Sequence, residues 1–178
     1  MSAARPSGRQ RVRRALLRAV GAAQRGGRAA VAPVPRRLLL IRPDHLGDVL
    51  WLTPALRGLR ARYPGAHISV AIGPWSRAIL DGNGDYDHLL TLDFPGFTRR
   101  AKGGPLAPYR ALAAAARDLR RERFDAALIL RDDHWWGALL AARAGISRRF
   151  GFAHPDVAPF LTDALPVPGG EHAGVGNV

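Results

Sequence analysis

Unbroken apolar runs alternate along this chain with apolar residues spaced three and four apart. The first run, residues 38–41, contains no polar position, which is typical of a strand buried on both faces of a parallel sheet. After a short polar turn the spacing becomes that of a helix, which we expect over residues 47–62. Its buried stripe would consist of Val49, Leu52, Leu56, Leu59 and Tyr63. The pattern therefore predicts a buried strand that leads through a loop into a helix.

The same alternation continues along the chain. We expect strands at residues 38–42, 67–72, 88–92, 125–130 and 148–152, and helices at residues 47–62, 74–80, 105–123 and 134–143. Pro54 lies inside the first helix and removes one backbone hydrogen bond, so a kink is expected there. The stripe of the third helix would be Leu106, Tyr109, Leu112, Ala116 and Leu119. The order predicts an α/β fold with helices on both faces of a mainly parallel sheet.

Positive charge is concentrated at the amino end of the chain. Residues 1–37 hold ten arginines and no acidic residue, whereas the rest of the chain carries 17 basic and 14 acidic groups. Because residues 1–35 carry charge without a core-forming pattern, we expect a mostly disordered basic tail there. Residues 11–24 could form a short basic helix on an anionic surface. The folded domain is expected over residues 36–168, followed by an irregular end at 169–178.

Composition and missing motifs narrow the function classes. Cysteine is absent, which excludes disulfides and thiolate metal sites. No apolar run approaches the ~18 residues of a membrane span, so a cytoplasmic protein is the default expectation. The chain has no dinucleotide fingerprint, Walker A motif, Gly-x-Ser-x-Gly elbow or zinc-ligand spacing, so dehydrogenases, P-loop enzymes and serine hydrolases are unsupported. The arginine-rich tail has no interleaved aromatic residues, which argues against specific nucleic-acid binding.

Gly47-Asp48 marks the strongest candidate site, because ligands in open parallel sheets bind beyond the carboxyl ends of the strands. Asp48 could act as a general base there. It could equally be the N-cap of the helix, with Gly47 allowing the turn. Asp44 and His45 share this loop and could orient a hydroxyl or carry a proton, or have no role.

Further candidates follow other strands. Arg42 and Arg131 each come after an apolar strand and would suit an acidic sugar or a phosphate, although Arg131 could be a surface residue. Trp75 could stack on a ligand or pack in the core. Asp132, Asp133 and His134 are consecutive, so a helix cap at Asp133 is favoured over a metal site. A basic cluster on the loop before the third long helix could meet an anionic ligand; it consists of Arg99, Arg100 and Lys102.

Five stretches carry a family resemblance. They are residues 41–56 (IRPDHLGDVLWLTPAL), 63–73 (YPGAHISVAIG), 74–82 (PWSRAILDG), 124–131 (FDAALILR) and 143–152 (RAGISRRFGF). In this order and spacing, the chain resembles the N-terminal half of the heptosyltransferase-like glycosyltransferases of family nine over about residues 36–155. The resemblance implies a Rossmann-like acceptor-binding domain of a two-domain GT-B architecture. Many members carry small hydroxyl residues where this chain has Asp44-His45.

The resemblance also implies a function. Members transfer a sugar with inversion from a nucleotide-sugar, such as ADP-heptose, to a lipopolysaccharide-core or other cell-envelope glycan, and the aspartate matching Asp48 is the proposed base. It implies acceptor contacts at Arg42, Asp44, His45, Gly47, Trp75, Arg131 and the basic cluster at 99–102, with no metal and no cofactor. The donor would need a C-terminal domain beyond Val178, so we expect the isolated chain to be inactive.

Two other functions stay open. The chain could be a non-enzymatic, truncated Rossmann-like binding domain, or, ranked lower, a nucleic-acid binder through its tail. The expected partners are a glycan or glycolipid acceptor and, at the inner face of the membrane, an anionic lipid surface.

Overall fold

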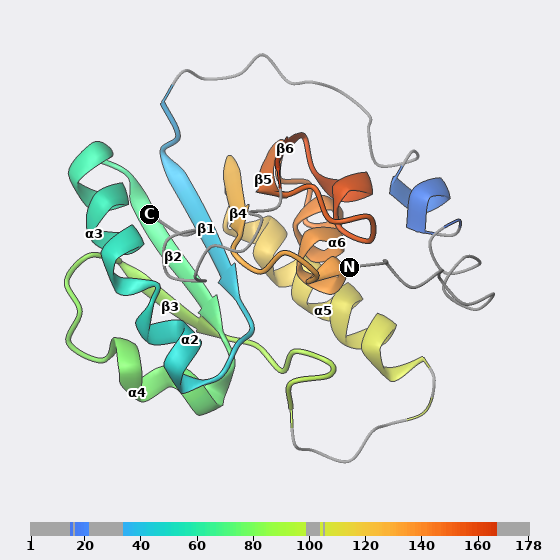
Figure 1. The fold of residues 1–178 in the computed structure, drawn as a ribbon, viewed down its shortest axis with the longest axis horizontal. Helices are drawn as coiled ribbons and strands as arrows, with labels where there is room; N and C mark the ends of the chain where they lie inside the picture. Colours follow the sequence, from blue (N-terminus) through green and yellow to red (C-terminus); the bar gives the residue numbers. More distant parts are fainter. Residues whose placement is uncertain (1–14, 16, 22–33, 99–103, 105, 167–178) are drawn as a thin grey trace, which may run out of the picture.

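The computed structural model describes residues 15, 17–21, 34–98, 104 and 106–166 (Figure 1). Six strands form one all-parallel sheet in the order β3-β2-β1-β4-β5-β6. The strands are β1 (Arg37–Arg42), β2 (His67–Ile72), β3 (His88–Thr91), β4 (Ala126–Ile129), β5 (Arg148–Phe152) and β6 (Asp163–Leu165). The helices are α2 (Leu46–Leu50), α3 (Thr53–Arg62), α4 (Arg77–Leu80), α5 (Ala107–Arg121) and α6 (Trp135–Arg143), with 3-10 turns η1 (Pro74–Ser76) and η2 (Ala158–Phe160).

The central strand β1 divides the core into two layers. Leu39 and Ile41 belong to the cluster that α5 and α6 cover, whereas Leu38 and Leu40 belong to the cluster under α2 and α3. Successive side chains of a strand point to opposite faces, so an unbroken apolar run fills both layers. The predicted parallel sheet with helices on both faces is confirmed, and it has a Rossmann-like α/β arrangement.

The helix predicted over residues 47–62 is two helices rather than one kinked helix. α2 ends at Leu50 and α3 begins at Thr53, with Pro54 in its first turn. Pro54 has no N–H to donate to the carbonyl of Leu50. That carbonyl accepts the Thr53 hydroxyl instead, at 2.9 Å. The Leu50 carbonyl therefore keeps a hydrogen-bond donor at the break between the two helices.

The amino end of α5 also differs from the prediction. Leu112, Ala116 and Leu119 are buried as expected, but Leu106 is 60% exposed and Tyr109 is 55% exposed. Leu106 precedes the helix as its N-cap residue, and this end of α5 projects beyond the sheet (Figure 1). The apolar spacing of the sequence does not show at which residue α5 extends past the sheet and its side chains become exposed. β6 was not predicted either, because its three residues are exposed and carry no apolar pattern.

A helical turn at residues 17–21 belongs to the segment expected to be a disordered tail. Leu17 is buried in the cluster under α5 and α6, and Val20 packs against that cluster. Gly21 lies so close to Pro159 that an added Cβ would stand 2.5 Å from the Pro159 carbonyl oxygen. The turn lies within residues 11–24, where a short helix was one of the expectations, and two apolar residues three apart give it a face that the domain covers.

The rest of the expected tail and the expected irregular end at 169–178 lie outside the described residues. Within the described ranges, no helix is long and apolar enough to cross a membrane.

Candidate functional site

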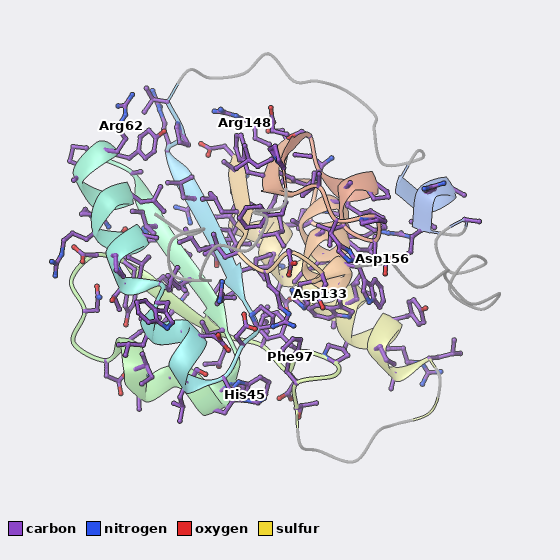
Figure 2. All side chains as sticks on the ribbon, viewed as in Figure 1. His45, Arg62, Phe97, Asp133, Arg148 and Asp156 are labelled. Atoms are coloured by element: carbon purple, nitrogen blue, oxygen red, sulfur yellow. The ribbon has the colours of Figure 1, made fainter. Side chains whose placement is uncertain are left out.

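The loops that follow β1, β2 and β3 enclose a pocket at the carboxyl edge of the sheet. Its volume is about 690 Å³. Its lining consists of His45, Leu46 and Gly47 after β1, Pro74 and Trp75 after β2, and Asp93, Phe97 and Thr98 after β3. Figure 2 shows His45, Phe97 and Asp133 together at this end of the molecule. A pocket at the carboxyl ends of parallel strands is where the sequence placed its candidate site.

Aromatic rings form much of the pocket wall. The His45 ring lies 5.5 Å from the Trp75 ring and 6.3 Å from the Phe97 ring, measured between centroids. The Trp75 ring lies over Gly73, where an added Cβ would stand 2.1 Å from it. Trp75 donates from Nε1 to the Asp44 backbone carbonyl at 3.0 Å and presents an apolar face beside polar groups. Such walls suit a ligand with both C–H faces and hydroxyl groups, as a sugar has.

Asp44 lies behind the pocket and joins three loops. It is 1% exposed, and its Oδ2 lies 2.7 Å from Arg42 Nε, outside hydrogen-bond angles. Its Oδ1 accepts a hydrogen bond from Arg131 Nη1. Its backbone oxygen accepts bonds from Trp75 Nε1 and Ser76 Oγ, each at 3.0 Å. The acceptor contact expected at Asp44 stays a prediction, and in this structure the carboxylate is paired with the protein's own cations.

The two arginines expected to bind an acidic ligand both contact this carboxylate, and their role in ligand binding stays a prediction. Arg42 is 5% exposed, and its Nη1 donates to the Leu130 carbonyl, so it does not open on the pocket. Arg131 donates from Nε to Asp133 Oδ1 at 2.6 Å, and its guanidinium carbon lies 5.2 Å above the Phe97 ring. Burial opposes the charge of Arg131, but hydrogen bonds to Asp133 and Asp44 raise its pKa above the usual value. Both guanidinium groups therefore pair with carboxylates of the protein itself.

Asp48 is an exposed carboxylate of this region, as are Asp93 and Asp133. It lies in the first turn of α2 and its side chain is 51% exposed. The described contact of its carboxylate is Arg42 Nη2, 4.0 Å from Oδ1. His45, rather than Asp48, is the N-cap of α2, and no side chain caps this helix. The capping interpretation is wrong, whereas the role of Asp48 as a base stays a prediction.

Gly47 is not required by backbone strain or by crowding from the protein. Its φ is not among the positive values, and an added Cβ would meet nothing within 4 Å. The expectation that Gly47 allows the turn is therefore wrong. Because Gly47 has no side chain, the rim of the pocket next to Asp48 is not covered at this position.

Behind Phe97 lies His134, which is 5% exposed. Its ring centroid lies 5.3 Å from that of Phe94 and 5.8 Å from that of Phe97. Neither ring nitrogen has a hydrogen-bond partner within the described part of the chain. Burial, with a smaller contribution from Arg131, lowers the pKa of His134 to about 3, so the ring is neutral at ordinary pH. His134 therefore packs as an aromatic residue.

Asp133 was expected to cap α6, but it does not. The N-cap residue is His134, without a side-chain cap, and Asp133 turns to Arg131. Burial raises and the Arg131 hydrogen bond lowers the pKa of Asp133, and the net effect is a lower value. Trp136 is buried and its Nε1 donates to the Pro108 carbonyl at 3.1 Å, so it packs in the core.

The sequence did not identify the pocket residues of the loop after β3. Asp93, Phe97 and Thr98 line the pocket. The available signal was an aromatic residue after Pro95-Gly96, at the end of a strand. The predicted basic cluster of Arg99, Arg100 and Lys102 lies outside the described residues.

Comparison with solved structures identifies the fold. The chain is similar to E. coli ADP-heptose lps heptosyltransferase II (TM-score 0.61, 24% identity, 74% of this chain and 35% of that one). It is similar to the glycosyl transferase family 9 structure from Veillonella parvula DSM 2008 (TM-score 0.68, 24% identity, 84% and 41%). It is also similar to E. coli heptosyltransferase WaaC with ADP (TM-score 0.63, 17% identity, 79% and 45%). The chain thus has the Rossmann-like fold found in these glycosyltransferases and spans less than half the length of each.

No protein-family model matches this chain, and no curated protein matches it.

Proposed function

We propose that this chain is the acceptor-binding half of a glycosyltransferase of the heptosyltransferase kind. The observation that carries the proposal is an exposed carboxylate, Asp48, beside an aromatic-walled pocket at the carboxyl edge of a sheet with this fold. The sugar to be extended lies in the pocket, with its C–H face on Trp75 and its reacting hydroxyl toward Asp48. The acceptor is a glycan or glycolipid, of which the lipopolysaccharide core is the expected example.

The proposed reaction is an inverting displacement. The acceptor hydroxyl oxygen forms a bond to the anomeric carbon of the donor sugar, and the bond from that carbon to the nucleotide phosphate breaks. The hydroxyl proton passes to the Asp48 carboxylate, and the nucleotide leaves with the bonding electron pair. Asp48 suits this role because half of its side chain is exposed and its arginine contact is as long as 4.0 Å. The step needs no cofactor or metal.

The nucleotide-sugar donor is held by a second domain in this proposal. The described chain spans 35–45% of the length of the similar structures. Transfer requires both substrates to be positioned together, and positioning supplies much of the rate. We therefore expect acceptor binding from this chain, and transfer only when a donor-binding domain is present. A peripheral contact with an anionic membrane would bring it to a glycolipid acceptor.

The experiment is an NMR titration of the whole chain with neutral and acidic core oligosaccharides, followed at the Trp75 indole N–H. The indole N–H of Trp136, which is buried and bonded to Pro108, serves as the internal control. We expect a saturable shift of the Trp75 signal and none for Trp136. No saturable shift with any glycan would contradict the proposal. If the chain binds a glycan but no sugar is transferred after a donor domain is supplied, the chain is a sugar-binding domain and not part of a glycosyltransferase.

A further inference from the structure

One guanidinium lies between two carboxylates of opposite exposure. Arg42, at the end of β1, places Nε 2.7 Å from Asp44 Oδ2 and Nη2 4.0 Å from Asp48 Oδ1. Asp44 is 1% exposed, whereas the side chain of Asp48 is 51% exposed. The two aspartates belong to the same loop and first helical turn. The same cation could pair closely with either of them.

Burial decides which pair forms. Asp44 is enclosed and would be a costly unpaired charge without its two arginines, Arg42 and Arg131. Asp48 is solvated, so it gains little from an ion pair that water and salt already screen. The Leu130 carbonyl fixes a third side of the Arg42 guanidinium, because it accepts from Nη1. Arg42 is therefore committed to the interior.

This commitment has a chemical consequence for Asp48. A carboxylate that pairs tightly with an arginine becomes a poorer proton acceptor, because the cation stabilises its ionised form. We propose that Asp44 is a positioning residue: by engaging Arg42 it keeps that guanidinium from closing on Asp48, so that the Asp48 carboxylate stays available to accept a proton. The catalytic meaning of this inference rests on the proposed function, whereas the arrangement of charges does not.

The other charged groups around Asp48 are few among the described residues. The loop before α2 contributes His45, the N-cap residue, and the loop after β3 contributes Asp93, which lines the same pocket as Gly47. Of the elements packed against α2, η1 carries no charged residue, and α4 carries the exposed Arg77 and is followed by Asp81. On its buried side Arg42 pairs with Asp44. Asp44 also pairs with Arg131, and Arg131 pairs in turn with Asp133. Arg42 is therefore the cation that contacts both Asp44 and Asp48.

The test is a carboxyl-carbon NMR titration of Asp48 in the whole chain, with its signal assigned by the Asp48→Asn variant. Asp44→Asn keeps the size of the side chain and removes its charge, so Arg42 loses its buried carboxylate while it keeps the Leu130 bond, and its Nη2 can close the 4.0 Å gap to Asp48. We expect the Asp48 midpoint to fall by about one pH unit, the low end of the shift that a neighbouring arginine produces. An unchanged midpoint in a folded Asp44→Asn variant would overturn the proposal.

A double variant separates pairing from the general loss of a negative charge. In an Arg42→Gln background, Asp44→Asn should move the Asp48 midpoint by a small fraction of that shift. A shift of equal size in this background would show that Arg42 is not the intermediary, and the proposal would be wrong. Asp133→Asn is the matched control, because Asp133 belongs to the same cluster but pairs with Arg131.

A second measurement covers the case in which Asp44→Asn does not fold. In the parent chain and in Asp48→Asn, we follow the Arg42 Nε–H signal across the titration of Asp48. If Asp44 holds Arg42, the signal is the same in both proteins and does not follow the Asp48 midpoint. A signal that tracks Asp48 would assign the arginine to Asp48 and overturn the inference.

These measurements need neither donor nor acceptor, so they stand even if no sugar transfer is found. Conversely, a negative titration would leave Asp48 as a candidate base. In an active assembly with a donor domain, Asp44→Asn would move the acid limb of the pH–rate profile to lower pH, in the direction of the NMR midpoint.

Discussion

At the amino edge of the sheet Asp87 and Asp125 accept backbone amides at the starts of strands, whereas at the carboxyl edge the Asp44 carboxylate is enclosed between two guanidinium groups. Asp125 Oδ2 accepts from the amides of Arg36 and Arg37 at 2.7 and 3.2 Å. Asp87 Oδ2 accepts from the Ile68 amide at 2.7 Å and from Arg60 at 2.6 Å, with 40% of its side chain exposed. Asp44, at the other edge, is 1% exposed between Arg42 and Arg131.

The difference shows how the two edges are used. The amino-edge aspartates close the starts of strands through backbone amides. Both edges join segments far apart in the chain, since Asp125 and Arg36 are 89 residues apart and Asp44 and Arg131 are 87 apart. What differs is that Asp44 holds charged side chains of two loops, whereas Asp125 holds neutral amides of one strand. A buried charge is costly unless it is fully paired, so it fixes its partners more strictly than a surface charge does. The carboxyl edge thereby combines an enclosed carboxylate, Asp44, with an exposed one, Asp48, in the same loop and first helical turn.

The largest effect is expected at Asp48. In an assembly with a donor domain, Asp48→Asn should lower the transfer rate by about 10²–10⁴-fold, the usual cost of losing a general base. Its free energy of unfolding should barely change, because Asp48 is half exposed and caps nothing. Initial rates of nucleotide release and thermal melts measure the two quantities. A variant within a few fold of the parent rate would end the catalytic assignment.

Asp44→Ala should destabilise the fold by about 3–5 kcal/mol, because it leaves Arg42 buried without its carboxylate. Urea unfolding of the whole chain gives the value. Asp48→Ala is the control four residues away and should cost less than about 0.5 kcal/mol. Equal losses for the two variants would remove the distinction between buried and exposed carboxylates at this edge.

His134 should make stability depend on pH. Burial lowers its pKa from 6.5 to about 3, so the unfolded state binds the proton first as the pH falls. Stability should thus decline from pH 6.5 downward and, from this group alone, lose on the order of 2–3 kcal/mol by about pH 4.5. His134→Leu, of similar volume, should flatten this part of the stability profile. An equally steep profile in the variant would place the titrating group elsewhere.

The smallest effect is expected at the amino edge. Asp125→Ala should cost about 1 kcal/mol, the usual net value of a hydrogen bond, since one of the two freed amides is exposed. Denaturant unfolding is again the measurement, with Asp87→Ala as the companion variant. A loss as large as that of Asp44→Ala would show that the two edges do not differ in the way described above.

The sequence by itself determined the sheet and the edge that carries the pocket. Runs such as 38–41 have no polar face and can be buried only between two layers, so a parallel sheet follows from their composition. His67–Ile72 and Arg148–Phe152 were predicted with their observed bounds. The position of Asp48 after a buried strand placed it at the carboxyl edge. These are local properties, and a one-dimensional pattern contains them.

Only the tertiary structure decided which polar residues became internal. Asp44 and Asp48 look alike along the chain, yet one is enclosed and the other is solvated. What encloses Asp44 is the convergence of Trp75, Ser76 and Arg131 from loops after other strands. The burial of a charge depends on neighbours that the sequence separates by up to 87 residues. Local pattern contains no record of that proximity, because the desolvation of a charge is set by everything that packs around it.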